Sequence, residues 1–579
     1  MKTSHLFLLA AVVPIIGNLR AADLQSLEKP GAAKPNVLLI CVDDLKPILG
    51  CYGDKNVKSP NVDRLAARGV QFDLAFCNQA VCAPSRNALL TGLRSQTLGI
   101  YDLGTNFRKS RPDAVTLPQY FKNNGWRTEA MGKIFHVGHG NHEDDASWSV
   151  PHWSPNSSGF GGYVLPENRP PTLTREEARA ANADPSKLPR GAPVECADVP
   201  DNSYGDGMIA DEAVARLRAA AAKPEQPFFI AVGFLKPHLP FVAPKKYWDL
   251  YKREQFELAK LQKPPEGAPE YAPTTWGELR QYSDIPEVGP LDPDKQRLLI
   301  HGYHAAVSYM DAQLGKVLDE FDKLGLAKNT IVILWGDHGW HLGDHGMWCK
   351  HTNYEQAGHI PFLVSAPGMK NGSRTKAMFE SVDLYPTLCE LAGLPIPAGL
   401  DGASFTAALR DPANAKTKDS VIHVFPRNVK GRGELLGRAV RTARYRMVEW
   451  KKPGDAPETA DIELYDYQTD PDETKNLAKE NPEIVAQLRA ILAKQPEAKP
   501  QIHPARDAGR PAAARPRQDR AAMFESRDKN HDGKLTREEF LANQPDPNEA
   551  PKRFLKFDSN GDGVLSREEF LNAGNAPAK

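Results

Sequence analysis

The sequence lacks an excess of either charge, lacks long apolar runs and has little cysteine. Its 579 residues include 73 basic and 73 acidic side chains, so there is no general attraction to nucleic acid or to an anionic membrane surface. Beyond residue 22, no stretch is long and apolar enough for a transmembrane helix. The seven cysteines are an odd number, so at least one thiol stays unpaired. The sequence predicts neither nucleic-acid binding nor a membrane span.

The one strongly apolar segment, residues 1–22, is short and lies at the N-terminus. Lys2 supplies a positive start, residues 6–16 supply an apolar core, and Ala21 and Ala22 are small. This order is typical of a cleaved signal peptide. No cysteine follows the cleavage region, so a lipoprotein anchor is not indicated. We therefore expect an exported protein, either periplasmic or extracellular.

Three apolar runs predict buried parallel strands, at residues 36–42, 227–234 and 330–336. Helical patterns lie between them, which predicts a doubly wound α/β sheet. Each run is followed by polar, ligand-type residues, namely Asp43 and Asp44, His238, and Asp337 and His338. Because ligands bind outside the carboxyl ends of the strands in such sheets, these residues are candidates for one site.

Changes of composition divide the chain into parts, since it is too long for one compact core. We expect a signal peptide (1–22), an α/β domain (33–378), a smaller α+β subdomain (379–495), a disordered linker (496–520) and an EF-hand pair (521–575). The linker is rich in Pro, Ala and Arg and has no apolar period. Residues 138–207 and 252–293 are expected to be loop insertions that shape a pocket.

Two twelve-residue segments near the C-terminus have the pattern of EF-hand calcium loops. Each has oxygen-bearing side chains at positions 1, 3, 5, 9 and 12 and glycine at position 6. The expected ligands are Asp528, Asn530, Asp532, Thr536 and Glu539, then Asp558, Asn560, Asp562, Ser566 and Glu569, with backbone carbonyls from Lys534 and Val564. Two such loops, each followed by a phenylalanine, predict an all-α EF-hand pair that binds up to two Ca²⁺ ions.

Cys82 stands where a helix is expected to begin. Pro84 suits the first turn because its missing N–H costs nothing there, and a helical pattern continues after it. The cysteine therefore faces the free N–H groups and the positive end of the helix dipole, which stabilise an anion. These residues alone leave two interpretations open: an anion-binding catalytic site, or a thiol with a lowered pKa and no role.

The segment from Cys82 to Gly92, CAPSRNALLTG, resembles the signature in which sulfatases have a cysteine oxidised to formylglycine. Segments such as MGKIFHVG and DHGWHLGDHGMWCKHTNYE extend the resemblance over most of residues 33–495. Their details are similar to the iduronate-2-sulfatase branch of the type I sulfatases. The resemblance implies a mixed sheet of the alkaline phosphatase/sulfatase type. It also implies hydrolysis of a sulfate ester, on a sulfated sugar or polysaccharide such as an iduronate 2-sulfate.

The resemblance implies roles for individual residues as well. Cys82 would become a hydrated aldehyde, in which one hydroxyl attacks sulfur and the other later expels sulfate. This requires a formylglycine-generating or equivalent maturation enzyme. The residues expected to assist are Arg86 at the geminal diol, Lys133 and Lys350 at the sulfate, His136 as the base, and His238 at the sulfate or the leaving oxygen.

By the same resemblance, one divalent cation is expected beside the oxidised Cys82. Its protein ligands would be Asp43, Asp44, Asp337 and His338, together with the oxidised Cys82 itself. Carboxylate oxygens suit calcium, and magnesium stays open. The cation would polarise the sulfate and lower the pKa of the attacking hydroxyl. His338 is an unusual ligand because most sulfatases have Asn there, whereas the iduronate branch has His.

Two other functions fit parts of the sequence. Metal-dependent phosphatases and phosphodiesterases share the architecture, but they use Ser or Thr as the nucleophile and a two-zinc cluster rich in His. Cys82, Lys133 and Lys350 argue against that class. An exported, non-enzymatic calcium-binding protein would use the EF-hand pair alone. That function requires an inactive α/β domain, although every expected catalytic residue is present.

Overall fold

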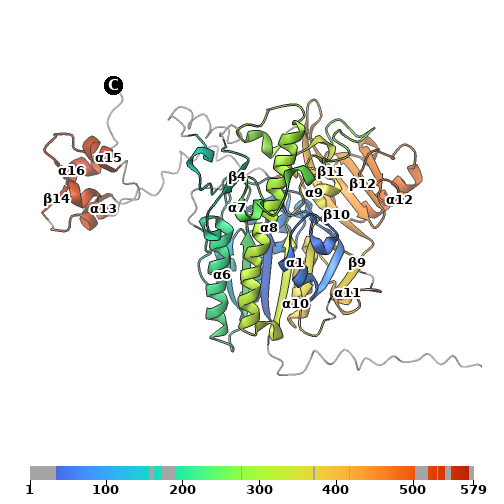
Figure 1. Ribbon diagram of the computed structural model, residues 1–579, viewed down its shortest axis with the longest axis horizontal. Coiled ribbons are helices and arrows are strands. Elements are labelled where there is room, and N and C mark those ends of the chain that lie inside the picture. The colour runs from blue at the N-terminus through green and yellow to red at the C-terminus, as the bar shows by residue number, and fades with distance from the viewer. Residues whose placement is uncertain are drawn as a thin grey trace, which may run out of the picture. The chain divides into compact units, whose positions relative to one another are not determined.

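The computed structural model forms two compact units, residues 1–502 and 503–579 (Figure 1). The expected signal peptide, residues 1–22, lies outside the described residues. Among those that are described, no helix has both the length and the apolar character needed to cross a membrane. The structure describes residues 34–155, 162–171, 190–274, 277–369, 372–415, 417–502, 520–530, 532–541 and 550–572.

A seven-stranded mixed sheet forms the centre of the first unit, with the order β3-β5-β1-β7-β8-β2-β9 (Figure 1). β8 is antiparallel to both of its neighbours, and the other neighbouring strands are parallel. The expected sheet type is thereby confirmed. The strands are β1 (Asn36–Val42), β2 (Val70–Phe76), β3 (Arg127–Gly132), β5 (Phe228–Phe234), β7 (Thr330–Gly336), β8 (Phe362–Ser365) and β9 (Ser373–Glu380).

The three apolar runs are β5, β1 and β7, which lie side by side. All of β5 and β7, and β1 from Val37 onward, are buried. Burial on both faces explains why each strand is continuously apolar rather than alternating. Val42 is in register with Phe234 and Gly336, so the three strands end at the same edge of the sheet.

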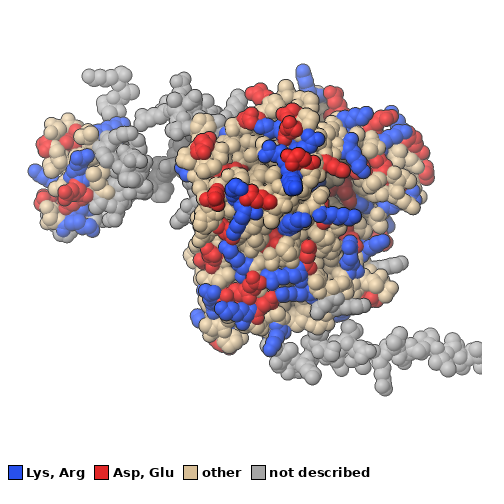
Figure 2. Space-filling model, in the orientation of Figure 1, with Lys and Arg blue, Asp and Glu red and all other residues tan. Residues whose placement is uncertain are grey.

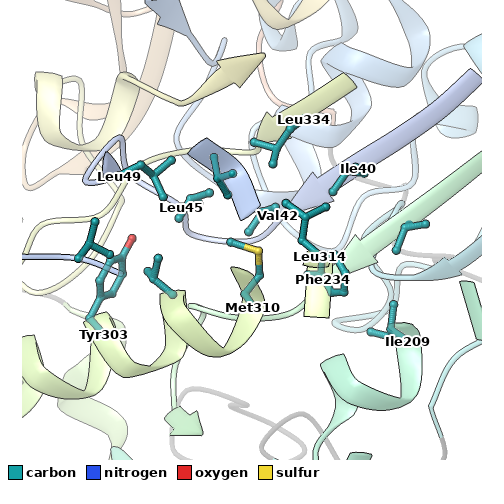
Figure 3. Close-up of a cluster of buried hydrophobic side chains, with 14 of the residues drawn as sticks. Ile40, Val42, Leu45, Leu49, Ile209, Phe234, Tyr303, Met310, Leu314 and Leu334 are labelled. Atoms are coloured by element: carbon teal, nitrogen blue, oxygen red, sulfur yellow. The ribbon is translucent and has the colours of Figure 1, made fainter. Parts of the chain in front are cut away.

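Helices cover both faces of this sheet, as the side chains of β1 show. Leu38, Ile40 and Val42 pack into one core, whereas Val37 and Leu39 pack into a second core. The first core includes residues of α1 (Pro60–Ala66), α6 (Gly205–Ala221) and α8 (Pro293–Lys323) (Figure 3). The second includes residues of α2 (Cys82–Thr91), α3 (Ser95–Leu98), α4 (Leu117–Asn123), α9 (Glu355–Gly358), α10 (Leu384–Leu391) and α11 (Thr406–Arg410).

The two expected insertions meet each other beside the main sheet. β4 (Val194–Ala197), in the first insertion, pairs in parallel with β6 (Phe241–Pro244), which precedes the second insertion and is followed by α7 (Lys245–Trp248). A short 3₁₀ helix, Glu278–Gln281, lies in the second insertion. The backbone N–H of Arg190 donates to the carbonyl of Gln281 at 3.4 Å, which ties the two insertions together.

A second, antiparallel sheet of four strands follows in the same unit. Its strands are β10 (Ser420–Val429), β11 (Gly433–Thr442), β12 (Tyr445–Lys451) and β13 (Asp461–Asp466), and α12 (Pro482–Leu492) packs on it. The boundary expected at residue 379 falls inside the main sheet, because β9 runs to Glu380. The change of pattern there marks an edge strand and two helices of the second core, and the second sheet begins at Ser420.

Residues 496–502 belong to the first unit, although the sequence analysis assigned them to the linker. Glu497 pairs with Arg438 at 3.1 Å and with Lys451 at 2.9 Å. Ala498 is buried, and the Lys499 backbone N–H donates to the carbonyl of Gln96 at 3.0 Å. Ion pairs and backbone hydrogen bonds hold this segment in place. It therefore needs no regular pattern of apolar residues to pack against the first unit. Residues 503–519 of the expected linker lie outside the described residues.

A chain that ends at Ile502 should keep the stability of the first unit, whereas one that ends at Gln495 should lose stability. The shorter chain lacks Glu497, and the Arg438 and Lys451 side chains, each 5% exposed, lose their carboxylate partner. Leaving buried donors unpaired costs about 1–3 kcal/mol each. Thermal unfolding of the two truncated proteins measures the difference. Identical melting temperatures would contradict the boundary at residue 502.

The second unit contains two similar helix–loop–helix segments. Their loops pair through β14 and β15, with Leu535 opposite Leu565. Phe524, Phe540 and Phe570 are in its small apolar core. The short strand pair is an addition to the all-α expectation. The elements are α13 (Arg520–Arg527), β14 (Lys534–Thr536), α14 (Arg537–Leu541), α15 (Ala550–Phe557), β15 (Val564–Ser566) and α16 (Arg567–Asn572).

Positive and negative side chains are interspersed on the surface of the first unit. Figure 2 shows Lys and Arg next to Asp and Glu over the face in view, without a large area of one sign. This distribution agrees with the equal numbers of basic and acidic residues in the chain.

Candidate active site

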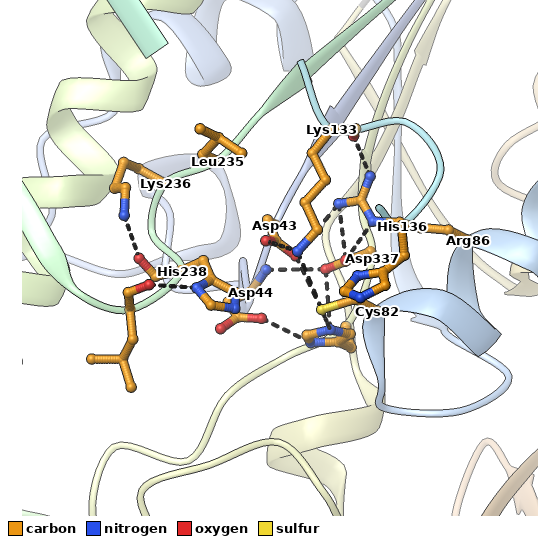
Figure 4. Close-up of polar contacts among 12 residues, drawn as sticks. Asp43, Asp44, Cys82, Arg86, Lys133, His136, Leu235, Lys236, His238 and Asp337 are labelled. Atoms are coloured by element: carbon orange, nitrogen blue, oxygen red, sulfur yellow. Dashed lines mark hydrogen bonds and ion pairs between the residues drawn. The ribbon is translucent and has the colours of Figure 1, made fainter. Parts of the chain in front are cut away.

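Cys82 is the first residue of α2 and lies at the carboxyl edge of the central strands (Figure 4). Its Sγ is 3.5 Å from Asp43 Oδ1, 3.4 Å from Lys133 Nζ and 3.3 Å from His338 Nε2. These partners follow β1, β3 and β7, so three strand ends converge on one helix start. α2 ends before Gly92, whose φ of 68° suits a left-handed helix cap.

The environment of Cys82 does not favour a reactive thiolate. The residue is 2% exposed. Burial raises the pKa of the Cys82 thiol, and Asp43 adds to this, while Lys133 opposes it. The raised pKa does not support the interpretation as a thiol with a lowered pKa. All seven cysteines of the chain, Cys82 included, are free of disulfides.

A buried cluster of ligand-type atoms surrounds Cys82. Asp43, Asp44, Cys82 and His338 each contribute an atom, and all of these atoms lie within 4.8 Å of one another. Asp337 lies beside them, because its Oδ1 accepts from the Asp44 backbone N–H at 3.0 Å. Asp44 has φ of 60°, an uncommon conformation for a residue other than glycine and one that often marks a functional site. Two carboxylates and a histidine can bind a divalent cation.

The two aspartates of this cluster differ in their electrostatics. Burial opposes the ionisation of Asp43. The neighbouring Lys133, His238 and Arg86 outweigh burial and hold the pKa of Asp43 well below its usual range. Burial raises the pKa of Asp44 to about 7, although Lys350 and His338 lower it. A divalent cation beside Asp44 would favour its ionised form.

Arg86 is fully buried in the middle of these carboxylates. It lies 2.9 Å from Asp337 Oδ2 and 3.5 Å from Asp43 Oδ1, and it donates to the carbonyl of Ile134 at 3.2 Å. These contacts connect α2 to β1, to β7 and to the segment after β3. Arg86 thereby balances buried negative charge and orients the helix that begins with Cys82. Its expected contact with a geminal diol stays a prediction.

Lys133 and His136 lie in the segment that follows β3. Lys133 Nζ pairs with Asp43 beside the Cys82 sulfur. His136 is buried, its Nε2 is 3.2 Å from His139 Nδ1, and its own Nδ1 has no hydrogen-bond partner. Burial, with help from Lys133, lowers the pKa of His136 to about 2, so the ring is neutral. An anion bound nearby would raise that pKa and make His136 a better base.

Lys350 and His238 lie on another side of the site, together with Glu278, which the sequence analysis missed. Lys350 Nζ is 3.0 Å from Asp44 Oδ1 and 2.8 Å from Glu278 Oε2. His238 Nε2 is 3.3 Å from Glu278 Oε1. Glu278 belongs to the second insertion, and Arg190 of the first insertion reaches it at 3.5 Å. A single glutamate in a loop has no motif around it, so no sequence signal identified it.

In the second unit, the two expected calcium loops have matching hydrogen bonds. Asp528 Oδ2 accepts from the Gly533 backbone N–H at 2.8 Å, and Asp558 Oδ2 accepts from that of Gly563 at 3.0 Å. Glu539 and Glu569, the last residues of the loops, each bond to the residue three positions earlier. The remaining expected ligands that bear side-chain oxygens lie in the same two loops, at Asn530, Asp532, Thr536, Asn560, Asp562 and Ser566.

Comparison with known proteins places these features in families. The sequence model of the sulfatase family matches residues 35–394. That of the C-terminal part of N-sulphoglucosamine sulphohydrolase matches residues 343–498, and that of the EF-hand domain pair matches residues 517–573.

Individual relatives agree with these matches. The chain is 37% identical to iduronate 2-sulfatase of Mus musculus over 459 residues, which cover 73% of this chain and 79% of the relative. It is 32% identical to a sulfatase of Formosa agariphila over 526 residues, which cover 86% and 92%. A protein solved with its substrate D-glucosamine-2-N,6-O-disulfate has a similar fold, with a TM-score of 0.62, 21% identity and coverage of 79% of this chain and 97% of that one. The chain belongs to the sulfatase family and is a sulfuric ester hydrolase that carries a C-terminal EF-hand pair.

Proposed function

We propose that this protein is an exported enzyme that hydrolyses a sulfate ester of a sulfated sugar or polysaccharide, with an iduronate 2-sulfate as the first candidate. The position of Cys82, buried at a helix start among Asp43, Lys133 and His338, carries the proposal. The substrate class comes from the relatives, which include an iduronate 2-sulfatase and a protein that binds a sulfated glucosamine.

Residue 82 would act as formylglycine, which a maturation enzyme makes from the cysteine. A buried neutral thiol is a weak nucleophile, and its sulfated form has no second hydroxyl to expel sulfate. In the hydrated aldehyde, one hydroxyl would lose its proton and its oxygen would bond to sulfur. The bond from sulfur to the sugar oxygen breaks, and that oxygen takes the electron pair and a proton. The second hydroxyl then loses its proton, the aldehyde re-forms, sulfate leaves, and water restores the diol.

The charged residues around position 82 suit these steps. Lys133 and Lys350 would neutralise the sulfate oxygens from two sides of the site. His136, with its buried and unpartnered Nδ1, would accept the proton of the second hydroxyl. His238 would donate a proton to the leaving sugar oxygen. Arg86 would keep the surrounding carboxylates in place.

The donor set around residue 82 fits one Ca²⁺ ion. Asp43 and Asp44 offer the oxygen ligands that a hard cation prefers, Asp337 lies beside them, and His338 supplies the one nitrogen. A bound cation would polarise the sulfate and favour the deprotonated form of the attacking hydroxyl. Lys133 and Lys350 already pair with Asp43 and Asp44, so the site balances its negative charge from the chain's own residues.

A screen of sulfated saccharides tests the substrate class. The protein should release inorganic sulfate from a disaccharide with a 2-sulfated iduronate, and it should release little phosphate from phosphate esters. Phosphate release without sulfate release would instead support the phosphatase alternative.

The EF-hand pair should bind two Ca²⁺ ions, and each Glu→Gln change at the last loop position should remove one. Glu539 and Glu569 are the expected bidentate ligands of the two loops. Calorimetric titration of the full-length protein with Ca²⁺ measures the number of sites. Glu538→Gln is the matched control, because Glu538 is exposed and adjacent to Glu539 but is not an expected ligand. An unchanged number of sites in Glu539→Gln and Glu569→Gln would contradict the assignment.

A further inference from the structure

Glu278 joins two of the cations that the sulfatase reaction uses. It is 6% exposed and comes from the 3₁₀ helix Glu278–Gln281. Its two carboxylate oxygens have different partners: Oε2 lies 2.8 Å from Lys350 Nζ, and Oε1 lies 3.3 Å from His238 Nε2. A buried carboxylate needs such partners, because an unpaired buried charge is costly.

The contacts of His238 fix the orientation of its ring. Nδ1 is 2.5 Å from the carbonyl oxygen of Leu239, which can only accept, so Nδ1 carries a hydrogen (Figure 4). Nε2 lies 3.3 Å from Glu278 Oε1, which is an ion-pair distance. The Leu239 carbonyl and the Glu278 carboxylate therefore hold the imidazole from its two sides.

Glu278 is ionised in this position. Burial opposes its ionisation, but Lys350, His238 and Arg190 outweigh burial and hold the pKa of Glu278 well below its usual range. Arg190 is further tied down by the Tyr282 hydroxyl at 3.1 Å and by Gln281 Oε1 at 2.9 Å. Both loop insertions therefore contribute to one charge network beside the reaction site.

We propose that Glu278 is a positioning residue for protonation of the leaving group: its carboxylate holds the His238 ring in place at Nε2 and holds Lys350 beside Asp44. This inference rests on the proposed function. As the bond from sulfur to the sugar oxygen breaks, that oxygen takes the electron pair and the Nε2 proton, which leaves a neutral imidazole. Glu278 exchanges no proton, and it acts through its charge and its position.

The test compares a poor leaving group with a good one. Glu278→Gln keeps the shape of the side chain but removes its charge. The probes are a disaccharide with a 2-sulfated iduronate, whose alkoxide needs a proton, and 4-nitrophenyl sulfate, whose phenolate does not. General acid catalysis accelerates a reaction by about 10²–10⁴-fold. In Glu278→Gln, kcat on the disaccharide should therefore fall by about 10²-fold. On 4-nitrophenyl sulfate, which needs no proton from His238, kcat should fall by much less, because only the placement of Lys350 is affected.

Two further variants separate positioning from loss of structure. Glu278→Asp retains the charge and should recover part of kcat on the disaccharide. Glu195→Gln changes another buried carboxylate, which accepts hydrogen bonds from the Val164 backbone N–H and the Tyr204 hydroxyl. This variant should alter kcat on the disaccharide and kcat on 4-nitrophenyl sulfate to the same degree. Equal loss on both substrates in Glu278→Gln, or a wild-type rate on the disaccharide, would overturn the inference. Wild-type protein inactive on both substrates would overturn the proposed function instead.

Discussion

Cys82→Ala should abolish sulfate-ester hydrolysis, and Cys82→Ser should complete at most one turnover per molecule. Alanine has no nucleophile, and loss of a covalent nucleophile costs about a thousandfold or more in kcat. Serine can accept the sulfuryl group but has no second hydroxyl to expel it. In the wild-type protein, the mass of the peptide that contains residue 82 should show oxygen in place of sulfur and the loss of two hydrogens.

A second buried cysteine provides the matched control. The Cys77 thiol is fully buried and donates to the carbonyl of Ala357 at 3.8 Å, and it is not among the ligand-type atoms clustered around residue 82. Cys77→Ser should therefore retain multiple turnover. Sustained turnover by Cys82→Ser, or an unmodified cysteine peptide from a fully active protein, would show that residue 82 is not the nucleophile in the proposed form.

Asp44→Asn should remove the cation of the catalytic site and lower kcat by at least about 100-fold. Substituting a residue that only contacts a ligand of a metal already lowers metal affinity or activity by about 10–100-fold. Substituting a ligand itself should lower them at least as much. Asparagine has the same shape and tolerates the φ of 60° at this position, so the backbone should not be disturbed. Elemental analysis of a chain that ends at Ile502 measures this cation without calcium from the EF-hand pair.

The control for this variant is a half-buried carboxylate outside the cluster. Asp344 pairs with Lys46 at 3.4 Å and accepts from the Leu342 backbone N–H, and it contributes no atom to the ligand cluster. Asp344→Asn should keep one cation per chain. If Asp44→Asn also keeps one cation and turns over normally, the ligands have been assigned wrongly.

The central sheet and much of the candidate site could be predicted from the sequence, because their signals are local. β1, β5 and β7 are continuous apolar runs since both of their faces are buried. Parallel strands end at a common edge, so Asp43 and His338 could be assigned to one site before their distance was known. The start of α2 at Cys82 and the two calcium loops are short patterns of neighbouring residues, which are equally visible in a sequence.

Only the tertiary structure decided how distant segments meet. Glu278 lies in a loop without a motif, and it gains its role because the insertion folds back onto Lys350 and His238. Glu497 extends the first unit through two ion pairs in a segment that is polar and rich in proline. Burial, which depends on the whole fold, raises the pKa of the Cys82 thiol even though its place at a helix start alone would lower it. Contacts and desolvation between residues far apart in the chain leave no local periodicity, which is why the sequence by itself could not reveal them.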